Sequence, residues 1–272
     1  MDTVAYLRRI GVDDPGPPTA AGLAALHRAH VERVPYETIE IQMQRPTTVD
    51  PHEAAERIVA RNRGGYCYHL NGAFSLLLKA LGYDVVWHRG GVQPRSAPEP
   101  VGATGNHLAL TVHGLSTDEN PEGDWLVDAG LGNGIHEPIP LIPGGYRQAP
   151  LTYELKRSAA EPGGWRLEQD PRMSWVGMDF RPRVATTDDF SERHQWLSTA
   201  PESPFVQSFT VQRRDEHGVD AVIGTALYHY PDGATTELDT QDVWLDVLRD
   251  RFAIELDAHE RDALWARVQY SR

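Results

Sequence analysis

The only cysteine of the chain, Cys67, has the residue type and the sequence context of a nucleophile. It follows Gly64-Gly65 and opens a segment whose apolar residues recur at helical spacing: Leu70, Phe74, Leu77, Leu78 and Leu81. This pattern predicts that the sulfur lies at a helix N-terminus, where free N–H groups and the helix dipole favour a thiolate. The alternative is an inert buried cysteine at a tight turn, since cysteine is among the most buried residue types.

A thiolate nucleophile needs a base, and the base needs a group that orients it. Among the 12 histidines, His107 opens a predicted strand on which the small residues Ala109 and Thr111 share its face and leave room for the ring. Asp128 ends another apolar strand, directly before a glycine-rich turn, and is well placed to bind an imidazole. A turn-forming aspartate is the alternative interpretation of Asp128.

Other histidines fit this chemistry less well. His69 is only two residues from Cys67, so it faces a different side of the predicted helix. His27 and His30 share one helix face and could suit a metal, but no cysteine or carboxylate accompanies them. We therefore expect a solvated histidine pair and no metal site.

The run Gly130-Leu131-Gly132-Asn133-Gly134 resembles a dinucleotide-binding loop, but three prolines follow it: Pro138, Pro140 and Pro143. Because a helix cannot start there, we reject a Rossmann interpretation. The flexible backbone could still offer N–H groups to a pantetheine or a phosphate, or it could simply link two strands.

Three regions differ in their hydrophobic period. The first 82 residues are predicted to be helical, with Asp2, Thr19 and Asp50 as N-caps. Strands follow, and the last third mixes strands with two capped helices. The predicted strands are 85–88, 107–112, 125–128, 152–157, 165–169, 205–213 and 221–230.

Composition narrows the range of partners. The 272-residue chain has a formal net charge of −13, which disfavours nucleic acid as a partner. A single cysteine excludes an internal disulfide and a zinc site built on cysteine pairs. No apolar stretch is long enough to span a membrane, and the N-terminus lacks signal-peptide features, so we expect a cytoplasmic protein.

Four motifs, in order along nearly the whole chain, resemble those of the arylamine N-acetyltransferase family. They are Pro35-Tyr36-Glu37-Thr38, Arg63-Gly64-Gly65-Tyr66-Cys67-Tyr68-His69-Leu70-Asn71, Asn106-His107-Leu108-Ala109-Leu110 and Asp128-Ala129-Gly130-Leu131-Gly132. The resemblance implies an α+β fold in three parts: a helical domain (1–84) with the nucleophile, a β-barrel (85–195) with the histidine and the aspartate, and an α/β lid (196–272).

The resemblance also implies a papain-like triad of Cys67, His107 and Asp128 and a ping-pong reaction. Cys67 would take an acetyl group from acetyl-CoA and pass it to an arylamine or a hydrazine, without a metal. Cofactor-binding roles are expected for three residues of the motifs: Asn106, Gly130 and Gly132. Glu37 and Arg63 are expected to pair beneath the nucleophile and hold its loop.

Two other activities use the same chemistry. Amide synthases of this superfamily transfer a polyketide chain from a carrier protein to an aryl amine, and the residues Ala129 and Leu131, smaller than the usual valine and phenylalanine, could widen the cleft for such a donor. A hydrolase of cysteine-protease type would release the acyl group to water. A third hypothesis is a binding protein with an inactive triad, but the presence of all three triad residues disfavours it.

Overall fold

The N-terminal helices begin at the residues that can cap them. Asp2 and Thr19 each accept a hydrogen bond from the N–H three residues further on, at 2.9 and 3.0 Å, and Asp50 caps the next helix with Pro51 at its first position. The computed structural model describes residues 1–270. Its N-terminal helices are α1 (Thr3–Arg9), α2 (Ala20–Arg33), α3 (Ile39–Gln42), α4 (Pro51–Arg61) and α5 (Cys67–Ala80).

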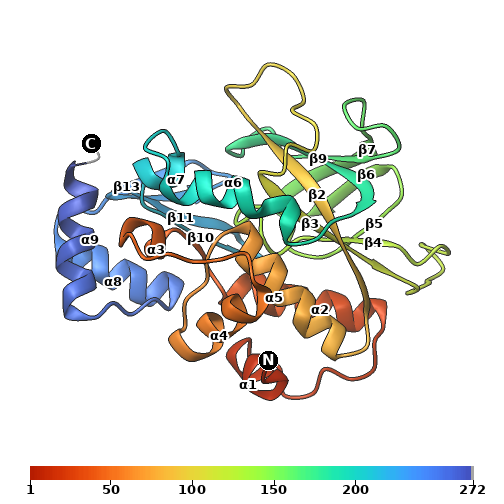
Figure 1. Cartoon of the computed structure of the whole chain (residues 1–272), viewed down its shortest axis with the longest axis horizontal. Helices are drawn as coiled ribbons and strands as arrows, with labels where there is room; N and C mark the ends of the chain where they lie inside the picture. Colours follow the sequence, from red (N-terminus) through yellow and green to blue (C-terminus); the bar gives the residue numbers. More distant parts are fainter. Residues whose placement is uncertain (271–272) are drawn as a thin grey trace.

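Helix α5 is the centre of the helical part (Figure 1). Its apolar stripe is buried except for Leu81 at its end, because α4 packs against one side of the helix and strands of the barrel against another. The buried residues of the stripe are Leu70, Phe74, Leu77 and Leu78. A helix buried on several faces cannot shift easily, so α5 fixes the position of Cys67 at its first turn.

The middle of the chain forms an eight-stranded antiparallel sheet that curls into a nearly closed barrel (Figure 1). Its strand order is β5-β4-β3-β2-β9-β8-β7-β6. The strands are β2 (Asp84–Pro94), β3 (His107–His113), β4 (Trp125–Val127), β5 (Ile139–Pro140), β6 (Gly144–Gln148), β7 (Leu151–Arg157), β8 (Trp165–Glu168) and β9 (Trp175–Val184). Leu110 of β3 pairs with Val127 of β4, which brings the start of β3 close to the end of β4.

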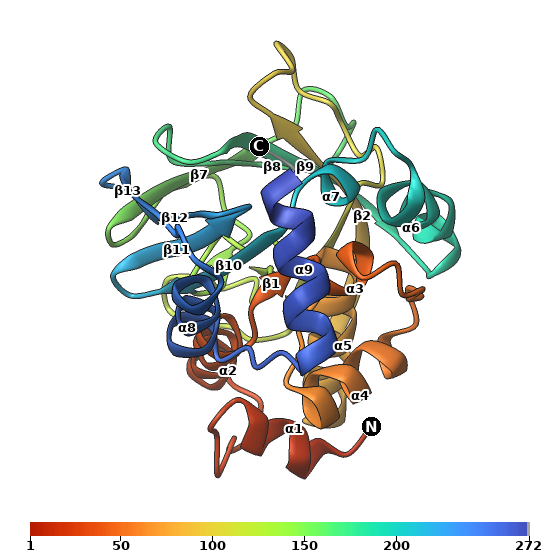
Figure 2. The same ribbon diagram turned by 90° about the vertical axis from the view of Figure 1, so that its left-hand side faces the viewer.

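The C-terminal part is a five-stranded sheet with two helices packed on it (Figure 2). A short strand from the helical part, β1 (Tyr36–Glu37), forms one edge of this sheet and thereby joins the two parts. The other strands are β10 (Thr210–Asp215), β11 (Gly218–Ile223), β12 (Ala226–Tyr230) and β13 (Ala234–Glu237), and the helices of this region are α6 (Asp188–Thr199), α7 (Pro204–Gln207), α8 (Gln241–Phe252) and α9 (Ala258–Tyr270).

Several expected elements differ in the structure. The strand expected at 205–213 begins with the helical turn α7, because Pro204 follows the N-cap Ser203. The strand expected at 221–230 is the hairpin of β11 and β12, which turns at Gly224 with φ +59°. Helix α6 was not expected, and the domain boundary proposed at 195 lies inside it. No helix within residues 1–270 is long and apolar enough to cross a membrane.

Arg63 does not pair with Glu37, contrary to our expectation. Its guanidinium donates to Glu260 of α9 at 2.6 Å and to the Glu255 carbonyl at 2.7 Å, and both charged side chains are almost fully buried. Glu37 instead accepts the Ile39 N–H, and its other carboxylate oxygen has no partner among the described residues. Arg63 therefore links the loop before Cys67 to the C-terminal helix.

This buried ion pair predicts a large stability effect. Arg63→Met leaves the Glu260 carboxylate without one of its charged partners and should lower the free energy of unfolding by about 3–5 kcal/mol, measured by urea denaturation. The control is Arg28→Met, which breaks the Arg28–Glu137 pair, whose side chains are 40% and 43% exposed. That change should cost less than about 1 kcal/mol. Equal losses in the two variants would contradict the assigned role of Arg63.

Candidate active site

The two glycines before Cys67 allow the chain to turn closely into α5. A Cβ at Gly64 would lie 1.7 Å from the Pro35 carbonyl oxygen, so only glycine fits there. Gly65 has φ +140°, and a Cβ on it would lie 2.6 Å from the ring of His69. That ring accepts the Tyr66 N–H at 3.3 Å and so helps to cap the helix. These contacts place Cys67 at the first position of α5.

Cys67 is well protected from solvent, with 3% of its surface exposed. Its sulfur lies 3.6 Å from the Asn106 carbonyl oxygen, in the loop directly before β3. As the first residue of α5, it has a backbone N–H that lacks an acceptor within the helix, and the helix dipole favours negative charge at this end. The structure thus has the helix start that the sequence predicted.

His107 lies beside this sulfur and is paired with Asp128. Its Nε2 is 2.7 Å from Asp128 Oδ2, and both side chains are almost fully buried. Burial lowers the pKa of His107, but the charge and the hydrogen bond of Asp128, together with the contact of Cys67, outweigh burial and raise that pKa to about 10. This raised pKa favours the imidazolium form of His107 at neutral pH. Since Nε2 is used by Asp128, Nδ1 is the nitrogen left for Cys67.

The carboxylate of Asp128 is held by three donors. Besides His107, its Oδ1 accepts from Asn71 Nδ2 at 2.8 Å and from the Gly130 N–H at 3.0 Å. The Asn71 amide also donates to the Leu108 carbonyl of β3 and accepts the Ala129 N–H. Asn71 thus connects α5 with the strand of the histidine and the loop of the aspartate.

Six other histidines are buried, and burial lowers their pKa below the ordinary histidine value, which makes them weaker bases: His27, His30, His69, His88, His136 and His194. His107 is the one histidine for which a raised pKa is found. Our expectation of a solvated pair at His27 and His30 was wrong, because both rings are completely buried.

The three residues expected to bind the cofactor have other contacts in the structure. The Asn106 side chain exchanges hydrogen bonds with the backbone of Val92 in β2, at 2.8 and 3.1 Å. A Cβ at Gly130 would lie 2.9 Å from Cys67 Cα, and one at Gly132 would lie 2.9 Å from the Tyr36 side chain. These glycines let the loop approach α5 and β1. Their contact with a cofactor stays a prediction.

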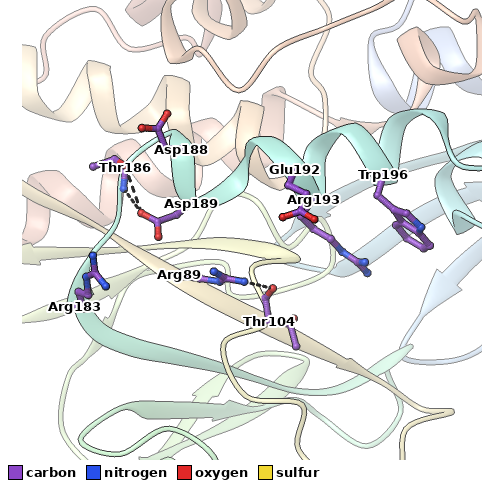
Figure 3. Close-up of a pocket in the computed structure, with 9 residues that line it drawn as sticks. All are labelled: Arg89, Thr104, Arg183, Thr186, Asp188, Asp189, Glu192, Arg193 and Trp196. Atoms are coloured by element: carbon purple, nitrogen blue, oxygen red, sulfur yellow. Dashed lines mark hydrogen bonds between the residues drawn. The ribbon is translucent and has the colours of Figure 1, made fainter.

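A cavity of about 610 Å³ lies between β2, the loop at Thr104 and α6 (Figure 3). Its wall includes Arg89, which donates to the Thr104 carbonyl at 2.8 Å, and Trp196, over which the Arg193 guanidinium stacks. None of the triad residues lines it, and its three arginines are matched by three acids: Asp188, Asp189 and Glu192. Within residues 1–270, no cluster of three or more His, Cys, Asp or Glu side chains could hold a metal.

Two residues at the site were missed by the sequence analysis as partners of the triad. Asn71 was noted only as part of a motif, although it bonds Asp128 directly. His27 receives the Asp128 backbone N–H at 3.3 Å. The available signal was a polar residue among apolar ones on each helix. Their shared partner Asp128, however, lies 57 residues from Asn71 and 101 residues from His27 along the chain.

The pairing predicts how Asp128 controls Cys67. Asp128→Asn removes the charge that keeps His107 protonated, so alkylation of Cys67 by iodoacetamide at about pH 6 should slow toward the rate of an ordinary thiol. In an analogous triad such a change lowers turnover by about 10⁴-fold.

The matched control is Asp124→Asn. Asp124 pairs with His113 at 2.7 Å at the other end of β3, but about a third of each side chain is exposed. This variant should be alkylated like the wild type. If both variants reacted like the wild type, Asp128 would be a turn residue without influence on the cysteine.

This chain is similar to known proteins over nearly its whole length. A family model described as N-acetyltransferase matches residues 19–261. The arylamine N-acetyltransferase of Mycolicibacterium smegmatis is 30% identical over 94% of this chain and 93% of its own, and that of Mycobacterium tuberculosis (strain H37Rv) is 28% identical over 98% and 95%. The Mycobacterium marinum arylamine N-acetyltransferase in complex with CoA superimposes with a TM-score of 0.86 at 27% identity, covering 99% of both chains. The chain therefore belongs to the arylamine N-acetyltransferase family.

Proposed function

We propose that this enzyme transfers an acetyl group from acetyl-CoA to an arylamine or a hydrazine, through an acetyl-thioester on Cys67. The observation that carries the proposal is the arrangement of Cys67 at the start of α5, next to the strand that opens with His107, whose ring is bonded to the buried Asp128 carboxylate. Family membership supports the reaction class, and the CoA bound to the M. marinum relative supports the donor.

In the first half-reaction the Cys67 thiolate attacks the thioester carbonyl of acetyl-CoA. The new bond joins sulfur to the acetyl carbon, and the bond to the CoA sulfur breaks. CoA leaves as a thiolate and takes the proton of the His107 imidazolium. Asp128 holds the ring by its Nε2, so Nδ1 is the nitrogen that delivers this proton.

In the second half-reaction the amine nitrogen attacks the acetyl carbon on Cys67. His107, now neutral, accepts a proton from the amine, and the Cys67 thiolate leaves, which restores the starting ion pair. Arylamines are weakly basic and therefore carry a free lone pair at neutral pH. The Cys67 N–H at the helix start is the proposed donor to the oxyanion of both tetrahedral intermediates.

The relatives favour a small donor over the two alternatives. Those cited above are arylamine N-acetyltransferases matched over nearly their full length, so they give no support to a carrier-bound polyketide chain. Hydrolysis would require water at the acetyl-thioester, and Cys67 has only 3% of its surface exposed in the free protein. Protection from water favours transfer to an amine.

The covalent step predicts a stable intermediate. Acetyl-CoA without an amine should add one acetyl group to the wild-type protein, as seen by intact-protein mass spectrometry, and Cys67→Ser should stay unmodified. Adding an aniline or a hydrazine should remove the group and form the amide. Amide formation without any acylated protein under these conditions would refute the ping-pong order.

Donor size separates acetyl transfer from amide synthesis. CoA release from acetyl-CoA should depend on the presence of an aromatic amine. A pantetheine thioester with a long acyl chain should acylate Cys67 more slowly. Acylation by the long-chain thioester together with no reaction of acetyl-CoA would instead identify an amide synthase.

A further inference from the structure

His27 contacts the proposed catalytic aspartate through the backbone N–H of Asp128, whereas His107 contacts its carboxylate. It belongs to α2, its ring is completely buried, and the ring packs edge-on against Phe74 of α5 at 5.9 Å between centroids. Because the ring does not reach solvent, its polar atoms gain nothing from water at this position. A buried imidazole is therefore expected to have specific partners for its two nitrogens.

Two hydrogen bonds define the state of this ring. Nδ1 lies 3.0 Å from the His136 carbonyl oxygen, which can only accept, so Nδ1 carries the proton. Nε2 lies 3.3 Å from the backbone nitrogen of Asp128, which can only donate, so Nε2 is unprotonated. His27 must therefore be neutral and in one tautomer. Burial supports the same state, because it lowers the pKa of His27 to about 4.

We propose that His27 is a positioning residue of the acetyl transfer, which accepts the Asp128 N–H and so fixes the backbone from which the carboxylate reaches His107. The proposal rests on one part of the proposed function, namely that Asp128 orients His107 and that His107 activates Cys67. Asp128 is then held from both ends: its carboxylate by Asn71 and Gly130, and its backbone by His27.

The second bond of His27 extends this support to the loop that follows. His136 lies beyond the glycine-rich turn, and its own ring pairs with Glu32 of α2 at 2.8 Å. One turn of α2 thus holds the chain at Asp128 and again at His136. Without His27, the buried Asp128 N–H would lose its acceptor, and the strand end could shift relative to His107.

The same helix offers a matched control. His30 lies one turn further along α2, is equally buried and also contacts Phe74, with ring centroids 4.8 Å apart. Its Nε2 hydrogen bonds to the Tyr6 hydroxyl at 2.9 Å, in the core between α1 and α2. Replacing His30 removes a buried imidazole and one hydrogen bond without touching Asp128.

The tautomer of His27 can be measured in the unmodified enzyme. Histidine ¹⁵N NMR at neutral pH should find His27 neutral with the proton on Nδ1, assigned by loss of its signals in His27→Gln. A proton on Nε2, or a charged ring, would leave no acceptor for the Asp128 N–H and would overturn the proposal without any variant having to fold or turn over.

Variants test the consequence for the cysteine. In His27→Leu, alkylation of Cys67 at about pH 6 should slow by about tenfold, the factor that the loss of one buried hydrogen bond produces. In His27→Gln the amide oxygen can replace Nε2 as acceptor, and the rate should return close to that of the wild type. His30→Leu should lose comparable stability in urea but keep the wild-type rate.

Equal rates for His27→Leu and the wild type, or equal slowing in His30→Leu, would reduce His27 to a packing residue. Because alkylation needs no acyl donor or amine, this outcome is separate from failure of the acetyl-transfer reaction itself. If His27→Leu does not fold, the proposal is tested by the tautomer of His27 and by the rate of Cys67 alkylation in His27→Gln. A folded His27→Gln with a strongly reduced alkylation rate would also contradict the proposal.

Discussion

Burial of the Asp128 carboxylate is the constraint on which the site depends. An ionised carboxylate away from water is costly unless donors surround it. Here the donors come from β3, through His107, from α5, through Asn71, and from the chain after the strand, through the Gly130 N–H. Satisfying one buried charge therefore requires the helical part and the barrel to meet in a single arrangement, and that arrangement brings the imidazole to the sulfur.

The loop before β3 completes this connection. Its Thr104 carbonyl accepts from Arg89 of the barrel, its Gly105 carbonyl accepts from Tyr68 of α5, and its Asn106 carbonyl oxygen lies 3.6 Å from the Cys67 sulfur. The Tyr68 hydroxyl bond is 2.6 Å long and buried. The loop is thus fixed against both the helix and the sheet, which keeps the residue that follows, His107, in register with Cys67.

Much of this arrangement could be predicted from the sequence, because helix caps and glycine turns are local. Asp2, Thr19 and Asp50 cap the helices that they were expected to cap. Contacts between distant segments could not be predicted in this way. Arg63 was assigned to Glu37 because the two lie in neighbouring motifs, yet its partner Glu260 is 197 residues further along the chain. Burial of His27 likewise depends on strands that the helix pattern does not reveal.

The central claim is that Asp128 and Cys67 together keep His107 protonated at neutral pH. The direct measurement is an NMR titration of the His107 ring in the wild-type protein, with His107→Gln for assignment. The account predicts a charged ring throughout the neutral range and a pKa of about 10. A ring that loses its proton near the ordinary histidine value of about 6.5 would contradict this claim, because His107 would then be largely neutral at pH 7.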